Sequence, residues 1–173
     1  YGAHRWDGGG GGRVWAPQAR CVALSGDFNG WQRGDMRRLE DGTWELAVEN
    51  ARQFDGYQYV VTQCDGREVW KSDPYGFHQE RRPSTNSKLY DIGGYQWHDE
   101  DWRQRCREHP AYREPVNIYE VHLGSWRQRP NGDFIDYRDL ADQLSAYVKE
   151  MGFNYIELLP ITEHPLDASW GYQ

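Results

Sequence analysis

The fold of the first half of the chain is decided by residues 14–31, which read VWAPQARCVALSGDFNGW. Two short apolar runs, Val14-Trp15 and residues 21–24, stand in this stretch, and the second is followed by the turn formers Asn29-Gly30. Short apolar runs between such residues are typical of β-strands joined by tight turns. The stretch therefore predicts β-structure.

The same pattern continues outward to about residue 98. Further strands are expected at four stretches: residues 44–48, 57–62, 68–70 and 89–90. The turn signals Asp41-Gly42 and Asp65-Gly66 separate them. Several short strands at this spacing predict a β-sandwich, which we assign to residues 1–98.

Residues 99–115 are polar and charged, and they end in prolines. We expect a linker or a short helix here, between two domains.

The pattern changes at residue 116. A strand is expected at residues 116–123, and an amphipathic helix follows from Tyr137 to Met151, whose apolar residues recur every three to four positions. Asp136 precedes this helix as an N-cap and Gly152 follows it as a C′ glycine. A second strand is expected at residues 155–159.

Strand, helix and strand with short connections form a βαβ unit, which requires a parallel strand pair. One such unit leaves two sheet edges open, so it cannot form a domain alone. We therefore expect residues 116–173 either to be part of a larger domain or to be poorly ordered.

A run of five glycines occupies residues 8–12. It does not match a phosphate-binding loop, because those motifs need glycines five positions apart. Glycine has a high conformational entropy cost in a strand. We therefore expect the first strand of the sandwich to be frayed or absent.

Aromatic residues are unusual in kind, with 9 Trp and 12 Tyr against 5 Phe in 173 residues. Trp and Tyr combine a flat apolar face with a polar edge. This combination suits sugar rings, although some all-β folds are simply rich in both residues. Composition thus favours carbohydrate without deciding for it.

The formal net charge of −7 argues against nucleic acid and against anionic membranes as partners. No run of about 18 apolar residues is present, so we expect no membrane span. The three cysteines lack metal or redox spacing, so we expect them reduced in a cytoplasmic protein. The first residue is Tyr1 rather than Met, so the natural N-terminus can lie further upstream.

Several motifs together resemble known proteins. The stretch from Val14-Trp15-Ala16-Pro17 through residues 26–31 to residues 71–75 (KSDPY) is similar to carbohydrate-binding modules of family 48, which are Ig-like β-sandwiches. Residues 118–126 (IYEVHLGSW) and 151–173 resemble the first two barrel strands of bacterial-type glycogen branching enzymes, of glycoside hydrolase family 13.

This resemblance implies an Ig-like sandwich followed by the first βαβ segment of a truncated (β/α)8 barrel. It implies an enzyme that forms α-1,6 branches in an α-glucan by retaining transglycosylation. The family's catalytic carboxylates belong to later strands, so no catalytic residue is assigned here, and the chain alone is expected to be inactive. No cofactor or metal is implied, and the parent enzyme is expected to be monomeric.

Three substrate-binding residues follow from the same resemblance. Tyr172 corresponds to the tyrosine that stacks on the sugar beside the cut bond, and Trp31 and Trp70 correspond to the glucan-stacking tryptophans of some modules. The alternative for both tryptophans is packing against the sandwich or the barrel. Lys71 is a weaker candidate.

Other polar residues are interpreted as structural. Glu120 and His122 share one strand face and are expected in the barrel interior. Glu157 is expected to be hydrogen-bonded in the barrel or at the domain junction. Glu163, His164 and Asp167 lack zinc spacing, so no metal site is predicted there.

Three rival readings stay open. The chain can be a non-catalytic α-glucan-binding module, which would not need residues 116–173. It can belong to another family-13 enzyme of debranching or trehalohydrolase type. It can also be a degraded gene product without function.

Overall fold

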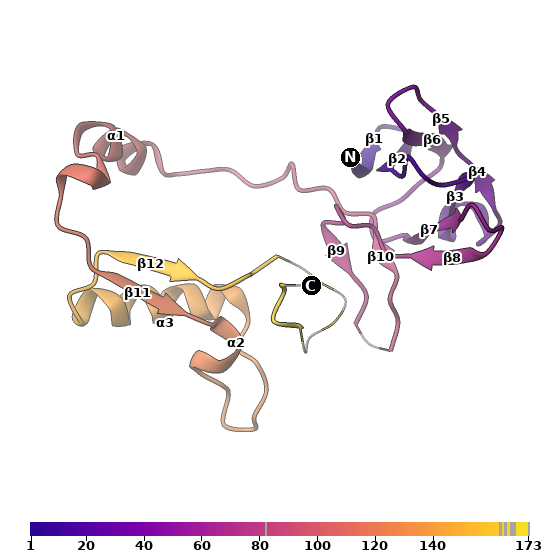
Figure 1. Cartoon of the computed structure of the whole chain (residues 1–173). Helices are drawn as coiled ribbons and strands as arrows, with labels where there is room; N and C mark the ends of the chain where they lie inside the picture. Colours follow the sequence, from indigo (N-terminus) through magenta and orange to yellow (C-terminus); the bar gives the residue numbers. More distant parts are fainter. Residues whose placement is uncertain (82, 163, 165, 167–168, 173) are drawn as a thin grey trace. The chain divides into compact units, whose positions relative to one another are not determined.

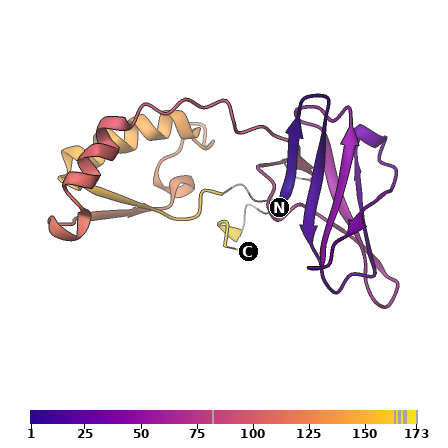
Figure 2. The same cartoon turned by 90° about the horizontal axis from the view of Figure 1, so that it is seen from above.

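The structure is a computed structural model that describes residues 1–81, 83–162, 164, 166 and 169–172. The chain divides into two compact units, the first built mainly from Tyr1–Tyr95 and the second beginning at Gln96. Both units are drawn in Figures 1 and 2.

The first unit is built from two mainly antiparallel sheets, consistent with an Ig-like sandwich. The first sheet has the order β1-β2-β6-β5: β1 Gly2–Trp6, β2 Gly9–Trp15, β6 Thr43–Glu49 and β5 Arg37–Arg38. The second sheet has the order β4-β3-β7-β10-β9, and β8 also pairs with β7: β4 Gly34–Asp35, β3 Cys21–Gly26, β7 Gly56–Thr62, β10 Ser87–Lys88, β9 His78–Gln79 and β8 Glu68–Lys71.

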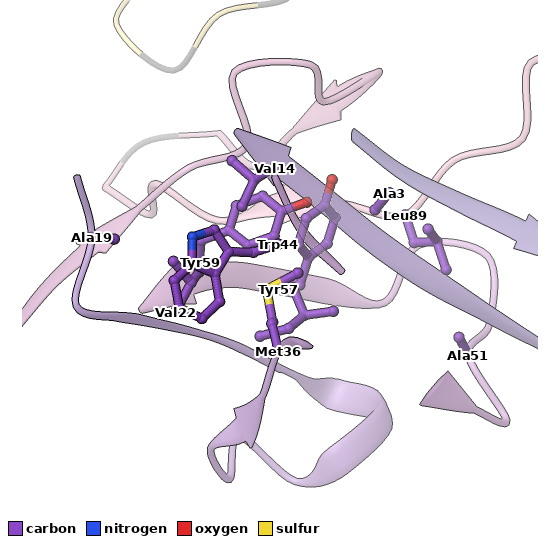
Figure 3. Close-up of a cluster of buried hydrophobic side chains, with 11 residues drawn as sticks. Ala3, Val14, Ala19, Val22, Met36, Trp44, Ala51, Tyr57, Tyr59 and Leu89 are labelled. Atoms are coloured by element: carbon purple, nitrogen blue, oxygen red, sulfur yellow. The ribbon is translucent and has the colours of Figure 1, made fainter. Parts of the chain in front are cut away.

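The core of this unit lies between the two sheets (Figure 3). Val14 and Trp44 come from the first sheet, and Val22, Tyr57 and Tyr59 come from the second. Every one of these side chains is at least nine-tenths buried. Because apolar residues alternate along these strands, one face of each sheet can close this core.

The predicted turns are confirmed. Gly42 and Gly66 have φ angles of 82° and 86°, which glycine adopts without the steric cost of a side chain. The Asn29-Gly30 turn follows a short 3-10 helix, η1, which spans Asp27–Asn29. Asn29 fixes this helix, since its side-chain oxygen accepts from the backbone N–H of Gly26 at 3.0 Å.

The glycine run forms a strand, so the expectation of a frayed or absent first strand is wrong. Residues 9–12 lie inside β2, which pairs with β1 on one side and β6 on the other. The packing explains the glycines, because a Cβ atom at Gly11 would lie 2.7 Å from the carbonyl oxygen of Leu46. Tertiary contacts therefore outweigh the poor strand propensity of glycine.

The strand expected at residues 89–90 is also displaced. The structure places β10 at Ser87–Lys88, and Leu89 follows it as a buried core residue. Leu89 exchanges backbone hydrogen bonds with the loop before β7, donating to Asp55 at 2.9 Å and accepting from Phe54 at 2.8 Å. These bonds replace a regular strand ladder.

The second unit contains α1 Glu100–Glu108, η2 Ala111–Arg113, β11 Ile118–Val121, α2 Leu123–Trp126, α3 Tyr137–Glu150 and β12 Tyr155–Leu158. The helix α1 lies within the predicted linker region. The strand expected at residues 116–123 is shorter than predicted, because Leu123 already begins α2.

The βαβ unit is confirmed. Strands β11 and β12 pair in parallel, with Glu120 opposite Glu157. The N-cap prediction is also confirmed, because the Asp136 carboxylate accepts from the backbone of Arg138 and Asp139. Gly152 follows the helix with a φ of 82°.

The helix α3 covers one face of the strand pair. Val121, Leu144 and Val148 form a small buried cluster there. The predicted apolar face of α3 is wider than the buried one, because Tyr137 and Met151 are exposed.

Candidate functional site

The first candidate residue, Trp31, lies directly after η1 in a left-handed conformation with a φ of 60°. Its indole Nε1 donates to Oδ1 of Asp27 at 2.8 Å. The other carboxylate oxygen of Asp27 accepts the backbone N–H of Gly56 at 2.7 Å. One carboxylate thus joins the indole to the first residue of β7.

The Trp31 ring lies beside Gly56, since a Cβ atom there would be 3.5 Å from its Cζ2 atom. The ring therefore lies on the face of the second sheet to which a side chain at position 56 would point. This is the outer face, because Tyr57 and Tyr59 point into the core from the alternate positions. Trp31 is 38% exposed on this face.

Trp70 lies on the same outer face. Trp70 pairs with Val60 on the neighbouring strand β7. Val60 lies four residues after Gly56, so its side chain points to the same outer face, and that of Trp70 points there too. Trp70 is 51% exposed. Strand β8 and the η1 turn therefore present two open indoles on one side of one sheet.

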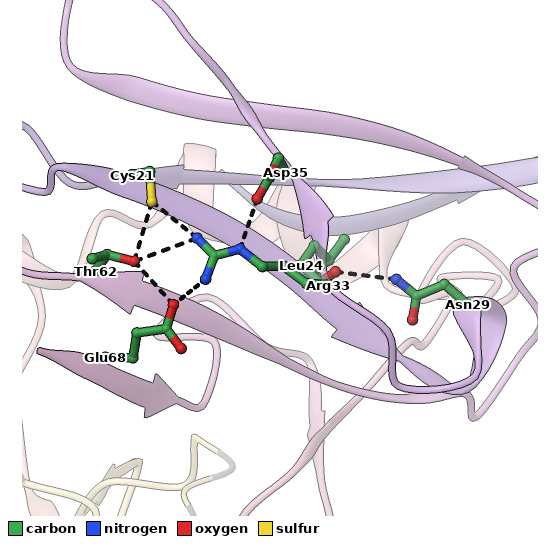
Figure 4. A network of polar contacts seen from close by, with 7 residues as sticks. All are labelled: Cys21, Leu24, Asn29, Arg33, Asp35, Thr62 and Glu68. Atoms are coloured by element: carbon green, nitrogen blue, oxygen red, sulfur yellow. Dashed lines mark hydrogen bonds and ion pairs between the residues drawn. The ribbon is translucent and has the colours of Figure 1, made fainter. Parts of the chain in front are cut away.

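A charged network borders this face (Figure 4). Arg33 donates from Nε to Asp35 at 2.8 Å, from Nη1 to Glu68, and from Nη2 to the Cys21 sulfur at 2.9 Å. Thr62 lies in the same network, and because it follows Val60 by two residues on β7, its side chain points to the same outer face. The pKa of Arg33 is raised, chiefly by its hydrogen bond to the Asp35 carboxylate, so the guanidinium stays charged.

The side chains of Lys71 and Trp70 point to opposite faces of the sheet, because Lys71 pairs with the core residue Tyr59. It is exposed at the sheet edge and does not share the Trp70 face. The structure therefore separates Lys71 from the two tryptophans.

The motif residues that follow Lys71 are anchored in the core. Asp73 is 3% exposed, and its Oδ2 accepts from the Tyr57 hydroxyl at 2.7 Å and from the Tyr59 hydroxyl at 3.4 Å. Ser87 Oγ accepts the backbone N–H of Asp73 at 2.8 Å. The pKa of both tyrosines is raised well above the ordinary tyrosine value. Burial is the larger cause, and the negative charge of Asp73 is the second.

Tyr172 belongs to the second unit and is 66% exposed. Its backbone N–H donates to the carbonyl of Ser169 at 3.3 Å, which closes a turn through Trp170. The Trp170 ring lies 4.9 Å from the ring of His122, at the end of β11. The turn is thus held against the strand end while the Tyr172 ring stays open.

The polar residues of the strand pair share one face. Glu120 and Glu157 are register partners, so both point away from the face that α3 covers. Both are exposed in this unit, and the hydrogen bonding expected for Glu157 in the barrel or at the domain junction stays a prediction. His122 contacts Ser125 Oγ at 2.9 Å through Nδ1.

No cluster of three or more potential metal ligands occurs among the described residues. Glu163 and Asp167 lie outside the described residues, so the arrangement of that group is not described. Cys21, Cys64 and Cys106 are free thiols. In the part of the chain that the structure describes, no helix has the length and apolarity to cross a bilayer.

Sequence reasoning missed Asp27, Gly56 and Arg33. The spacing of Asp27 and Trp31, four residues apart across a glycine turn, was a usable signal for the first contact. Gly56 and Arg33 reach the site only through strand pairing, which local sequence does not reveal.

Comparison with known proteins agrees with this architecture. The model of carbohydrate-binding module 48, described as the isoamylase N-terminal domain, matches residues 1–76. The chain is 47% identical over 180 residues to the 1,4-alpha-glucan branching enzyme GlgB of Bacillus caldolyticus, covering 100% of this chain and 27% of the relative. It is 46% identical over 163 residues to GlgB of Halothermothrix orenii, covering 92% and 26%.

Solved structures show the same fold. A crystal structure of an α-amylase candidate from Salmonella typhimurium superposes with a TM-score of 0.69 at 25% identity, covering 99% of this chain and 26% of that one. The chain spans about a quarter of the length of the curated relatives it matches. It therefore belongs with the N-terminal part of the 1,4-alpha-glucan branching enzymes and opens with a carbohydrate-binding module of family 48.

Proposed function

We propose that the first unit binds α-1,4-linked glucan through Trp31 and Trp70. The observation that carries this proposal is the position of both indoles on the outer face of the second sheet, each more than a third exposed. The names of the relatives point to the polymer, since they are 1,4-alpha-glucan branching enzymes.

The chemistry of the face suits a glucan. An indole offers a flat apolar surface to the CH groups of a glucose ring, while its surroundings supply hydrogen bonds to hydroxyls. Because Asp27 holds the Trp31 Nε1 at 2.8 Å, the ring is oriented before a ligand arrives. Preorganisation of this kind lowers the entropy cost of binding.

Titration calorimetry with maltoheptaose tests this site. We expect Trp31→Ala and Trp70→Ala each to weaken binding about tenfold, which corresponds to the loss of one aromatic contact. Trp97→Ala is the matched control, since Trp97 is 70% exposed and lies in the other unit. Unchanged affinity in the Trp31/Trp70 double variant would refute the proposal.

We further propose that residues 1–98 form the binding module, residues 99–115 a linker, and residues 116–173 the start of a (β/α)8 barrel. The parallel β11–β12 pair supports this, because α3 covers one of its faces and leaves Glu120 and Glu157 on the other. In a barrel, that second face would point to the interior. Trypsin digestion followed by mass spectrometry tests the boundaries, with first cuts expected within residues 99–115.

The proposed activity of the whole protein is the transfer of a glucan segment to a 6-hydroxyl, with retention at the cut α-1,4 bond. We propose that the carboxylates for this step lie outside these 173 residues, in a cytoplasmic monomer without a cofactor. The 173 residues alone should leave the iodine colour of amylose unchanged. A falling colour would contradict this.

Tyr172 is proposed to stack on the sugar beside the cut bond. A hybrid enzyme, in which these residues replace the equivalent part of the Bacillus caldolyticus relative, allows a test. Tyr172→Phe should keep activity, whereas Tyr172→Ala should lower kcat/KM about tenfold, the value of one aromatic contact. Equal activity in both would rule out stacking.

A further inference from the structure

The outer face of the first sheet contains a trough of about 750 Å³ that the proposed function does not use. Its floor comprises Gly11 and Ala47, and Trp6 lies across it. The side chains of Val14 and Trp44 point into the core. Positions 9, 11 and 47 alternate with them along β2 and β6, so they face away from the core.

The glycines make room for the Trp6 ring. A Cβ atom at Gly11 would lie 2.8 Å from Cη2 of Trp6, and one at Gly9 would lie 3.2 Å from its Nε1. The indole therefore lies directly on the backbone of β2. Trp6 is nevertheless 49% exposed, so much of its surface is open to the trough.

The rim of the trough is polar, and its charged side chains are held in ion pairs. Arg13 contacts Glu45 at 2.6 Å, and Arg37 contacts the other oxygen of the same carboxylate. Asp35 also lines the trough and pairs with Arg33 at 2.8 Å, so the arginine and carboxylate side chains of the rim all stand in ion pairs. The pKa of Glu45 is lowered, first by its hydrogen bond from Arg37 and then by that from Arg13. Glu45 therefore stays ionised and paired at neutral pH.

A flat indole, a floor of glycine and alanine and an ion-paired rim fit a neutral polyhydroxylated ligand better than an anion or a cation. The glucose rings of an α-glucan have this chemistry, with apolar CH faces for the indole and hydroxyls for the guanidinium and carboxylate groups. We propose that this trough, centred on Trp6, is a second α-glucan-binding site of the first unit. The proposal rests on the proposed function for the identity of the polymer.

Two sites on one unit would act together on a long polymer. Trp6 lies on the first sheet and the Trp31–Trp70 face on the second, so the sites lie on opposite sides of the sandwich core. A branched polymer can present chains to both, and linked binding events raise the overall affinity. Losing Trp6 should therefore weaken glycogen binding more than maltoheptaose binding.

Indole N–H resonances distinguish the two sites in the 173-residue chain. We expect maltoheptaose to shift the Trp6 signal, assigned through Trp6→Phe, in both the parent and the Trp31→Ala/Trp70→Ala double variant. Ala47→Gln should abolish that shift by filling the trough without changing Trp6. Ala146→Gln, the same change at an exposed position of α3, is the matched control and should leave the shift intact.

Each outcome decides between the sites. A Trp6 shift that survives the double variant and disappears in Ala47→Gln supports the trough. Shifts at Trp31 and Trp70 with a silent Trp6 would overturn this inference and leave the proposed function standing. Silence at all three residues would overturn both. Thermal melting of each variant shows that the sandwich is still folded.

Discussion

The indole of Trp31 and the carboxylate of Asp27 are joined by a 2.8 Å hydrogen bond within one turn of chain. The same carboxylate binds the backbone of Gly56 at 2.7 Å, so it links the η1 turn to β7. Asp27 is therefore a positioning residue for the proposed binding face, acting through Trp31 and Gly56.

Removal of this carboxylate should act through Trp31. We expect Asp27→Ala to weaken maltoheptaose binding about three- to tenfold, because the indole loses its preorganised orientation. Asp27→Asn should lose part of the affinity, since its single amide oxygen can accept from the indole or from the Gly56 N–H but not from both. Calorimetry measures both, and Asp142→Ala on α3 serves as control. If Asp27→Ala in a Trp31→Ala background causes a further loss of the same size, Asp27 does not act through Trp31.

Asp73 should be a major contributor to the stability of the sandwich. Asp73→Ala leaves the buried Tyr57 hydroxyl and the backbone N–H of Tyr75 without their acceptor. Buried donors without an acceptor are costly, and we expect a loss of about 3 kcal/mol in the free energy of unfolding. Urea unfolding followed by near-UV circular dichroism measures this loss. Asp91→Ala, at an exposed position, should change stability by less than about 0.5 kcal/mol.

The sandwich should lose stability at alkaline pH. The pKa values of Tyr57 and Tyr59 are raised by burial in the folded chain, whereas in the unfolded chain they stay near 10. Their contribution is therefore complete below pH 10. It is lost as the pH rises above 10, because only the unfolded state then releases the protons, at about 1.4 kcal/mol per pH unit for each tyrosine.

Absorbance at the tyrosinate band, recorded against pH together with circular dichroism, tests this dependence. The Tyr57→Phe/Tyr59→Phe variant should lose the steep part of the stability decline above pH 10. Ionisation of both tyrosines before any loss of the folded signal would contradict the assignment.

The glycine run should resist substitution at its packed positions. In Gly11→Ala, the added methyl group would lie 2.7 Å from the Leu46 carbonyl oxygen and would displace the Trp6 ring. We expect a loss of about 2 kcal/mol in the free energy of unfolding, typical of overpacking. Gly94→Ala is the control, because a Cβ atom there meets no other atom. Equal melting temperatures for the two variants would show that the crowding at Gly11 relaxes without cost.

Local signals were sufficient for the ends of α3 in the second unit. Asp136 and Gly152 bracket α3 because a cap and a left-handed glycine act within a few residues, and both ends were predicted from sequence. The parallel pairing of β11 with β12 followed from the short connections. The continuation of these strands into a barrel remains a proposal.

Long-range packing determined what sequence could not predict. The strand β2 was misjudged because the need for glycine comes from Leu46 and Trp6, which lie far from the run or across a hairpin. The Arg33 network was missed for a similar reason, since Glu68 is 35 residues away. Trp31 and Trp70 were identified by resemblance, but their common face emerged only from the register of β7 and β8.

The length of the glycine run sets the direction in which Trp6 points. Residues 9–12 carry no side chains that could hold β2 in one register, so the alternation of β1 is set by counting residues from Arg13 through the hairpin. The gain or loss of a single glycine would leave the composition almost unchanged. If the change were taken up within β2 and not in the Asp7-Gly8 turn, Trp6 would point inward and Ala3 outward, so the length of the run decides which face of β1 carries the indole.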